Sequence, residues 1–407
     1  MRPFVISVTV LIVGILCASQ KNDEQIEKKV SGVENGLVEV KAPIQIFQAG
    51  PPEGREKMGL SERMTQFGVP GVSIAVINDY QIEWEKAYGL IDAGSDKPVD
   101  TKTVFEAAST TKLLASVIAL RLVEQGQLDL DEDVNQRLKS WKIPESEFTA
   151  EKKVTLRSLL THQSGLNRPD GGFSEEEGSV PTLVQVLKGE APAKNLAAVV
   201  EFTPGTQWQY SNFGYLVIQL LLEDVLDKPF SQIAREVLFD PLGMKNSTLV
   251  HPLKAEFKTN IALPHDQEGT AHDRPQHPTA LAQGGLVTTS SDLARFAIEL
   301  MRAYQDKSDA VLSQASVQRM FTVQRELDPA ALGGITGQGL GVFLLGEGQN
   351  LYFLYAGHNN PGATSIVVTS SATGKGAVIM TNGVAGLPLS FEILAAVADE
   401  YDWPTVQ

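Results

Sequence analysis

The sequence predicts an α+β protein in which an antiparallel sheet is formed from both ends of the chain, is flanked by helices and carries an inserted all-α lobe. The first observation behind this prediction is that β-branched and apolar runs typical of strands lie near both ends. The second is that helical patterns fill the middle of the chain. With 407 residues, 43% hydrophobic and 20% charged, the chain can bury a substantial core.

The expected elements follow in chain order. A helix is expected at 55–67. The β-branched run 72–77 and the run 81–88 are separated by Asn78-Asp79, which predicts an antiparallel hairpin. Helices are expected in the middle of the chain at 112–124, 156–160, 215–227 and 230–238. The remaining expectations are strands at 341–345, 351–355, 365–369 and 376–381, a turn at 370–374 and a closing helix at 391–401.

The N-terminus has the pattern of an export signal. A positive charge at Arg2 precedes the apolar run 4–16, and small residues follow it. We expect a signal peptide at 1–19, cleaved after Ser19, and a periplasmic or extracellular protein without a membrane span in its mature chain. Cys17, the single cysteine, allows no internal disulfide, and its lipidation is the alternative to cleavage after Ser19.

The expected domain limits follow from these patterns. We expect a charged linker at 20–45 and one folded domain at 46–400. Within it, 46–108 and 285–400 would form the α/β body and 109–284 the helical lobe. The formal net charge of −15 and the pI of about 4.9 exclude a general attraction to nucleic acid.

A Ser-x-x-Lys motif, Ser109 to Lys112, lies at the start of the helix expected at 112–124. The spacing puts hydroxyl and amine on one face of a helix, one turn apart. Serine needs an adjacent base to act as a nucleophile, and a lysine drawn into a cleft can lose its proton and act as that base. Backbone N–H groups at the helix start can hold an oxyanion. Taken alone, the motif is more typical of a serine N-cap followed by a solvated lysine than of a catalytic pair.

The second motif is Tyr210-Ser211-Asn212, which follows Pro204-Gly205 and precedes a helix. A tyrosine near a lysine can be held ionised and act as a general base, and an asparagine amide can orient a substrate. The motif therefore lies on a turn, where exposed catalytic groups usually occur. A loop tyrosine that packs on the helical lobe is the alternative.

Taken in order, several segments between about Gly71 and Gly383 resemble the serine β-lactamase and penicillin-binding-protein superfamily, nearest its class C branch with related esterases and D-amino-acid peptidases. These segments are 105–112, 124–131, 159–166, 204–215, 241–244 and 284–294. The resemblance implies that Ser109 is the nucleophile, that Lys112 and Tyr210 are the coupled general base and acid, and that Asn212 orients the substrate. Which of Lys112 and Tyr210 is the base stays open.

The family's third motif, Lys/His-x-Gly on a strand, has two candidate registers here. Choosing His358-Asn359-Asn360 would put Pro361, which has no N–H, at the position that completes the oxyanion hole. Choosing Tyr355-Ala356-Gly357 keeps the glycine and offers the N–H of His358, and we favour it. It leaves no cation where the family binds substrate carboxylates, which favours an uncharged ester or amide.

The sequence thus predicts a serine hydrolase that forms an acyl-enzyme on Ser109 with a small ester or amide, with a D-amino-acid peptide or a β-lactam still open as the substrate. Asn212, Tyr355, Gly357 and His358 would bind the substrate, without a cofactor. The alternative is a non-catalytic penicillin-binding-like protein that recognises cell-wall or peptide ligands.

Histidines elsewhere in the chain have structural explanations. His162 precedes Ser164, but the chain has no Gly-x-Ser-x-Gly elbow, so we expect it to make structural hydrogen bonds. His265, His272 and His277 lie in a loop pattern without helical spacing, and we expect no metal there.

Overall fold

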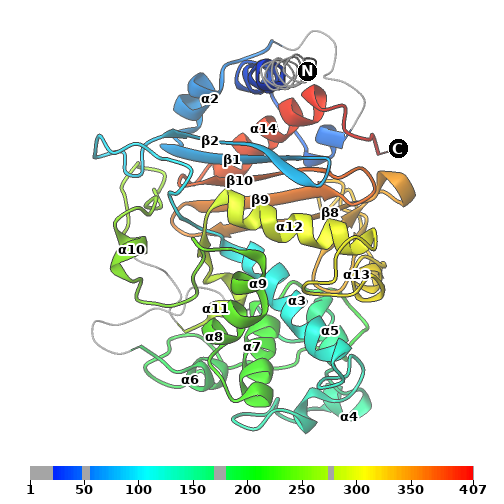
Figure 1. Cartoon of the computed structure of the whole chain (residues 1–407). Coiled ribbons are helices and arrows are strands. Elements are labelled where there is room, and N and C mark those ends of the chain that lie inside the picture. Colours follow the sequence, from blue (N-terminus) through cyan, green and yellow to red (C-terminus); the bar gives the residue numbers. More distant parts are fainter. Residues whose placement is uncertain (1–21, 48–55, 169–179, 274–278, 407) are drawn as a thin grey trace, which may run out of the picture.

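The computed structural model of the chain describes residues 22–47, 56–168, 180–273 and 279–406. Figure 1 shows a central sheet with α14 (Gly386–Glu400) on one face and α12 (Ser290–Tyr304) on the other, and a helical lobe on the α12 side. The predicted α+β class, with an antiparallel sheet and a mostly helical middle segment, is confirmed. The signal peptide expected at 1–19 lies outside the described residues.

The sheet combines strands from both ends of the chain. In the described part of the chain it has eight strands in the order β2-β1-β10-β9-β8-β7-β6-β5, all antiparallel to their neighbours. The strands are β1 (Gly71–Asn78), β2 (Gln81–Gly89), β5 (Arg325–Glu326), β6 (Gly337–Gln338), β7 (Phe343–Leu345), β8 (Tyr352–Asn359), β9 (Ala363–Ser370) and β10 (Lys375–Thr381). A separate short pair consists of β3 (Phe105–Glu106) and β4 (Val287–Thr288).

The first hairpin forms for a local reason. Asn78 pairs with Gln81, so the loop has two residues, and Asp79 and Tyr80 both have positive φ, 50° and 59°. A two-residue loop with both residues in the left-handed region matches the twist of the flanking strands. β1 then pairs with β10, so the N-terminal hairpin extends the C-terminal strands at one edge of the sheet, with β2 outermost.

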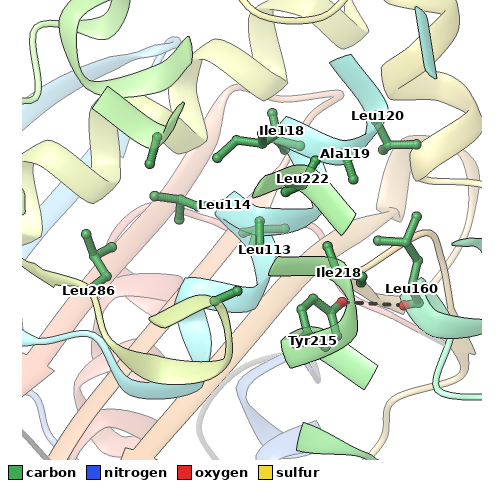
Figure 2. Close-up of a cluster of buried hydrophobic side chains, with 14 of the residues drawn as sticks. Leu113, Leu114, Ile118, Ala119, Leu120, Leu160, Tyr215, Ile218, Leu222 and Leu286 are labelled. Atoms are coloured by element: carbon green, nitrogen blue, oxygen red, sulfur yellow. Dashed lines mark hydrogen bonds between the residues drawn. The ribbon is translucent and has the colours of Figure 1, made fainter. Parts of the chain in front are cut away.

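The core of the lobe surrounds α3 (Thr111–Glu124), an almost uniformly apolar helix buried on all sides. Figure 2 shows Leu113, Leu114 and Ile118 of α3 near Ile218 and Leu222 of α7 (Asn212–Leu226). This packing fixes the start of α3, which carries the Ser-x-x-Lys motif, relative to the start of α7, which follows Tyr210.

The remaining helical elements connect these layers. They are η1 (Pro43–Phe47), α2 (Leu60–Phe67), η2 (Ala108–Thr110), η3 (Val134–Gln136), α4 (Glu147–Glu151), α5 (Leu156–Leu160), α6 (Leu183–Lys188), α8 (Phe230–Ala234), η4 (Arg235–Phe239), α9 (Asp240–Leu242), α10 (Ala255–Lys258), α11 (Leu281–Gly284), α13 (Gln314–Met320) and η5 (Gly348–Asn350). Within the described ranges, no helix is long and apolar enough to cross a membrane.

We expected a linker at 20–45, but the described residues of this segment belong to the fold, which corrects that expectation. Residues 22–34 are helical, and Val30, Val33 and Leu37 are buried in the cluster that includes Ile393 and Val397 of α14. Val30 and Val33 lie on one face of this helix, which packs beside α14, while the charged residues earlier in the helix, such as Glu27 and Lys28, are exposed. Leu37 also exchanges backbone hydrogen bonds with Met58.

Candidate active site

The serine of the first motif lies on a strained turn that leads from β3 into α3. Ala108 has a φ of 48°, and η2 (Ala108–Thr110) continues directly into the helix. This turn presents the half-buried Ser109 at the N-terminus of α3, while Lys112 on the first turn of α3 is fully buried. A hydroxyl at this place lies at the positive end of the helix dipole.

Two predicted side chains meet at Ser109. The Nζ of Lys112 donates to Ser109 Oγ at 3.0 Å, and the hydroxyl of Tyr210 donates to the same Oγ at 3.0 Å. Lys112 Nζ also donates to the carbonyl of Gln283 on α11 at 2.5 Å. The structure therefore brings together groups that are 101 positions apart in the chain.

The protonation of Lys112 and Tyr210 is shifted in the direction that a base needs. Burial lowers the pKa of Lys112, and the charge of Arg168 lowers it further, against the opposing effect of Tyr210. Burial by itself would raise the pKa of Tyr210, but the Lys112 ammonium and hydrogen bonds from its neighbours bring it below its ordinary value. Because each group changes the other's charge state, they lose protons as a pair.

The second motif is held by the start of α7. Ser211 caps this helix, because its Oγ accepts the backbone N–H of Gly214 at 3.2 Å. Asn212 is the first residue of α7 and is half-buried. Its side chain makes no hydrogen bond to another described residue, so the structure brings it to the motif without fixing the direction of its amide.

The third-motif candidate lies on β8, whose residues Tyr355 and Gly357 point to the same face. A Cβ at Gly357 would lie 2.6 Å from the carbonyl oxygen of Ala107 and 2.7 Å from the backbone nitrogen of Ser109. Only a glycine allows this approach of strand and turn. The arrangement supports the Tyr355-Ala356-Gly357 register, because the glycine that touches the Ser109 turn is Gly357.

The side chains around this glycine differ in their surroundings. Tyr355 is 1% exposed, and its hydroxyl has no hydrogen bond of normal geometry to a described residue. Burial, with Tyr210 nearby, raises the pKa of Tyr355 well above its ordinary value, so this phenol stays neutral. His358 is exposed, and its ring nitrogen Nε2 lies 3.2 Å from Asn360 Oδ1.

Known proteins agree with this architecture. The family description Beta-lactamase matches residues 60–401. The chain belongs to the beta-lactamase family. Esterase EstB of Burkholderia gladioli is 29% identical over 53% of this chain and 53% of its own length. A putative D-alanyl-D-alanine carboxypeptidase of Escherichia coli O157:H7 is 29% identical over 52% of this chain and 50% of its own length.

The chain spans about half the length of these curated relatives. Among solved structures, the D-amino acid amidase from Ochrobactrum anthropi superposes with a TM-score of 0.67 at 22% identity, covering 88% of this chain and 98% of that chain. This likeness shows the fold, and the resemblance inferred from the motifs is confirmed by the family match.

Two residues of this beta-lactamase-family site were not expected from sequence. The Nδ2 of Asn359 donates to Glu106 Oε2 at 2.9 Å and to the carbonyl of Gly284 at 3.2 Å. Burial raises the pKa of Glu106 to about 7. One buried amide thus connects the end of β8, the strand before Ser109 and the segment whose Gln283 carbonyl holds Lys112. Glu106 lies just before the Ser-x-x-Lys motif, in the segment 105–112, but its partner is 253 positions away.

The histidine loop has internal partners. Both ring nitrogens of His265 are in hydrogen bonds, one from the N–H of Ala93 at 3.0 Å and one with the carbonyl of Asn382 at 3.1 Å. His272 lies 2.8 Å from Asp266. His277 is outside the described residues. Across the described ranges, no group of three or more metal-binding side chains is present.

Proposed function

We propose that this protein is a serine hydrolase that forms an acyl-enzyme on Ser109 with a small ester or amide. The observation that carries the proposal is the position of Ser109 Oγ, which accepts hydrogen bonds from both Lys112 Nζ and Tyr210 Oη at 3.0 Å. Two proton-handling groups with lowered pKa values at one serine suit acyl transfer, in which the serine must lose a proton and the leaving group must gain one.

When both Lys112 and Tyr210 donate to Ser109, each of them carries a proton. In the reactive form the pair has lost one of these two protons. In that reactive form the Ser109 hydroxyl gives its proton to the pair, and Oγ forms a bond to the substrate carbonyl carbon. The carbonyl oxygen becomes an oxyanion, which the backbone N–H groups of Ser109 and His358 would stabilise.

Collapse of this intermediate breaks the bond to the alcohol or amine, which leaves with the proton that the pair had taken. Water then attacks the acyl-enzyme and passes a proton to the same pair. Ser109 regains a proton and the carboxylic acid is released. Each proton removed is returned within one cycle, so no cofactor is needed for this chemistry.

The chemistry at position 355 supports an uncharged substrate. A neutral, buried Tyr355 occupies the place of the cation that binds carboxylates in the family's usual third motif. An ester or amide without a carboxylate loses no binding partner when a tyrosine replaces the cation at position 355. A β-lactam carboxylate would lack its partner there. The esterase name of one relative is compatible with this range.

The test is a comparison of Ser109→Ala with the unaltered protein on short-chain p-nitrophenyl esters, nitrocefin and D-alanyl peptides. We expect Ser109→Ala to lose at least about 10³-fold in kcat on the best substrate. A fluorophosphonate probe should label Ser109 in the unaltered protein. Full hydrolysis by Ser109→Ala would refute the proposal, and an inert Ser109 with retained peptide binding would favour the non-catalytic binding protein.

We also propose that the protein is exported, with cleavage after Ser19. The charge, apolar run and small residues of 1–19 support this. Mass spectrometry of the mature N-terminus separates cleavage after Ser19 from lipidation of Cys17, and an intact Met1 in the purified cellular protein would contradict export by this route.

A further inference from the structure

His162 lies behind Tyr210 in a place that the proposed mechanism does not use. It follows α5, is 1% exposed and has a φ of 55°. A positive φ is uncommon for a residue other than glycine, and a position that keeps it is held by its surroundings. At His162, those surroundings are the Tyr210 loop.

Both chain neighbours of Tyr210 donate to this one residue. The N–H of Gln209 donates to the backbone carbonyl of His162 at 2.8 Å, and the N–H of Ser211 donates to its ring nitrogen Nδ1 at 3.2 Å. Tyr210 is therefore fixed from both sides by the same residue. The rings also meet, since the centroids of His162 and Tyr210 are 4.4 Å apart and their planes differ by 33°.

The Nδ1 contact requires a neutral imidazole, because an acceptor nitrogen cannot carry a proton. Burial lowers the pKa of His162 to about 3, and the charge of Lys112 adds to the effect. The hydrogen is then on Nε2, which has no hydrogen-bond partner among the described residues. Nδ1 accepts from Ser211, and Nε2 meets no described group to which it could pass a proton. The position of this imidazole therefore suits the contact with Ser211 and not proton transfer.

We propose that His162 is the positioning residue of Tyr210: through its carbonyl and its Nδ1 it fixes the loop on both sides of the tyrosine and so holds the phenol within hydrogen-bond distance of Ser109. This inference rests on the proposed function for its kinetic consequence. The position of the phenol itself can be measured independently of any activity.

Two substitutions separate the acceptor from the ring. In His162→Asn, the side-chain oxygen is attached to Cγ as Nδ1 is in histidine, so it can accept from Ser211, and asparagine tolerates a positive φ. In His162→Phe, the aromatic contact with Tyr210 is retained and the acceptor is lost. The hydrogen bond from Gln209 goes to the backbone carbonyl, so its acceptor is present in both variants, whereas only phenylalanine adds backbone strain at a φ of 55°.

We expect His162→Phe to lower kcat by about 10- to 100-fold with KM within about twofold, because a displaced phenol costs rate more than binding. His162→Asn should stay within about threefold of the unaltered kcat. Spectrophotometric titration of the phenol, with Tyr210→Phe as the reference, should show a higher pKa for Tyr210 in His162→Phe. The reason is that Tyr210 then moves away from the Lys112 ammonium that lowers its pKa.

His265→Phe is the matched control. It also removes a buried ring nitrogen that accepts a backbone N–H, from Ala93, but it lies outside the Ser109 contacts. It should lower the thermal stability as His162→Phe does while kcat and the Tyr210 titration stay unchanged. An unchanged Tyr210 titration in folded His162→Phe would overturn the proposal, and so would an equal loss of kcat in His265→Phe. Failure of the proposed function would appear instead as an active Ser109→Ala protein.

Discussion

Adding one methyl group at Gly357 tests whether β8 and the Ser109 turn form a single oxyanion site. The new Cβ would lie 2.6 Å from Ala107 O, 2.7 Å from Ser109 N and 3.0 Å from the Cβ of Ala108. The first two are backbone atoms, which cannot rotate away as a side chain can. Strand and turn must therefore separate by roughly 0.7 Å to restore van der Waals contact.

This separation falls between the two N–H groups assigned to the oxyanion. One belongs to Ser109 and the other to His358, the residue after Gly357. Loss of one oxyanion donor costs about 10²- to 10³-fold in kcat, and a misplacement near 1 Å costs about 10²-fold. We therefore expect Gly357→Ala to lower kcat about 100-fold, or about 2.7 kcal/mol of transition-state stabilisation, with KM changed by less than about threefold.

The assay is steady-state and burst hydrolysis of the best p-nitrophenyl ester, with thermal unfolding followed by circular dichroism. Gly59→Ala is the control, because Gly59 has an ordinary φ of −79° and no atom within 4 Å of a Cβ placed there. It should leave kcat unchanged. If folded Gly357→Ala kept kcat within about threefold of the unaltered protein, the proposed pairing of the Ser109 and His358 donors would be wrong.

Three further outcomes are expected. Glu106→Gln should gain thermal stability relative to the unaltered protein as the pH rises from 5 to 8. Burial raises the pKa of Glu106 to about 7, so between about 4.5 and 7 the folded unaltered protein binds a proton that the unfolded chain does not, and it loses up to about 3 kcal/mol of stability across that window. A melting-temperature difference that is constant with pH would contradict this. Leu37→Ala, at a fully buried position, should lower the free energy of unfolding by about 2–5 kcal/mol, measured by denaturant unfolding. The same substitution in a linker would not change it measurably. Tyr210→Phe should lower kcat about 10²- to 10³-fold with an unchanged melting temperature, because it removes a proton-transfer group and leaves the ring in place; rates equal to those of the unaltered protein would leave Lys112 as the sole base.

The parts of the fold that depend on local sequence were predictable. The hairpin of β1 and β2 follows from a β-branched run and a two-residue loop, and both lie within twenty residues of one another. Ser109 and Lys112 are one turn apart on a helix, so their contact follows from the spacing. Tyr210 was placed near them by the order of motifs that the family shares, and the family match covers all three residues.

Other features depend on which surfaces meet, and their local patterns did not reveal this. The helical residues 22–34 carry few apolar side chains, so charge dominates their composition, yet Val30 and Val33 are buried in one cluster with residues of α14. Helix α12 was also not expected, although it has a buried face against β1, β2, β9 and β10. A helix that covers a sheet is stabilised mainly by that contact, and its own sequence shows only part of the reason for it.

The Glu106–Asn359 contact could not be predicted from the separate sequence motifs. Asn359 is the middle residue of the alternative register His358-Asn359-Asn360, which would put Pro361 at the oxyanion position. Its amide instead joins β3, the Gln283–Gly284 segment and β8. Lys112 donates to Gln283, and His358 directly precedes Asn359. A single side chain therefore couples the position of Lys112 to that of the proposed oxyanion donor. A motif encodes the groups that react, whereas the distances between motifs are set by buried contacts such as this one, which only the folded chain brings together.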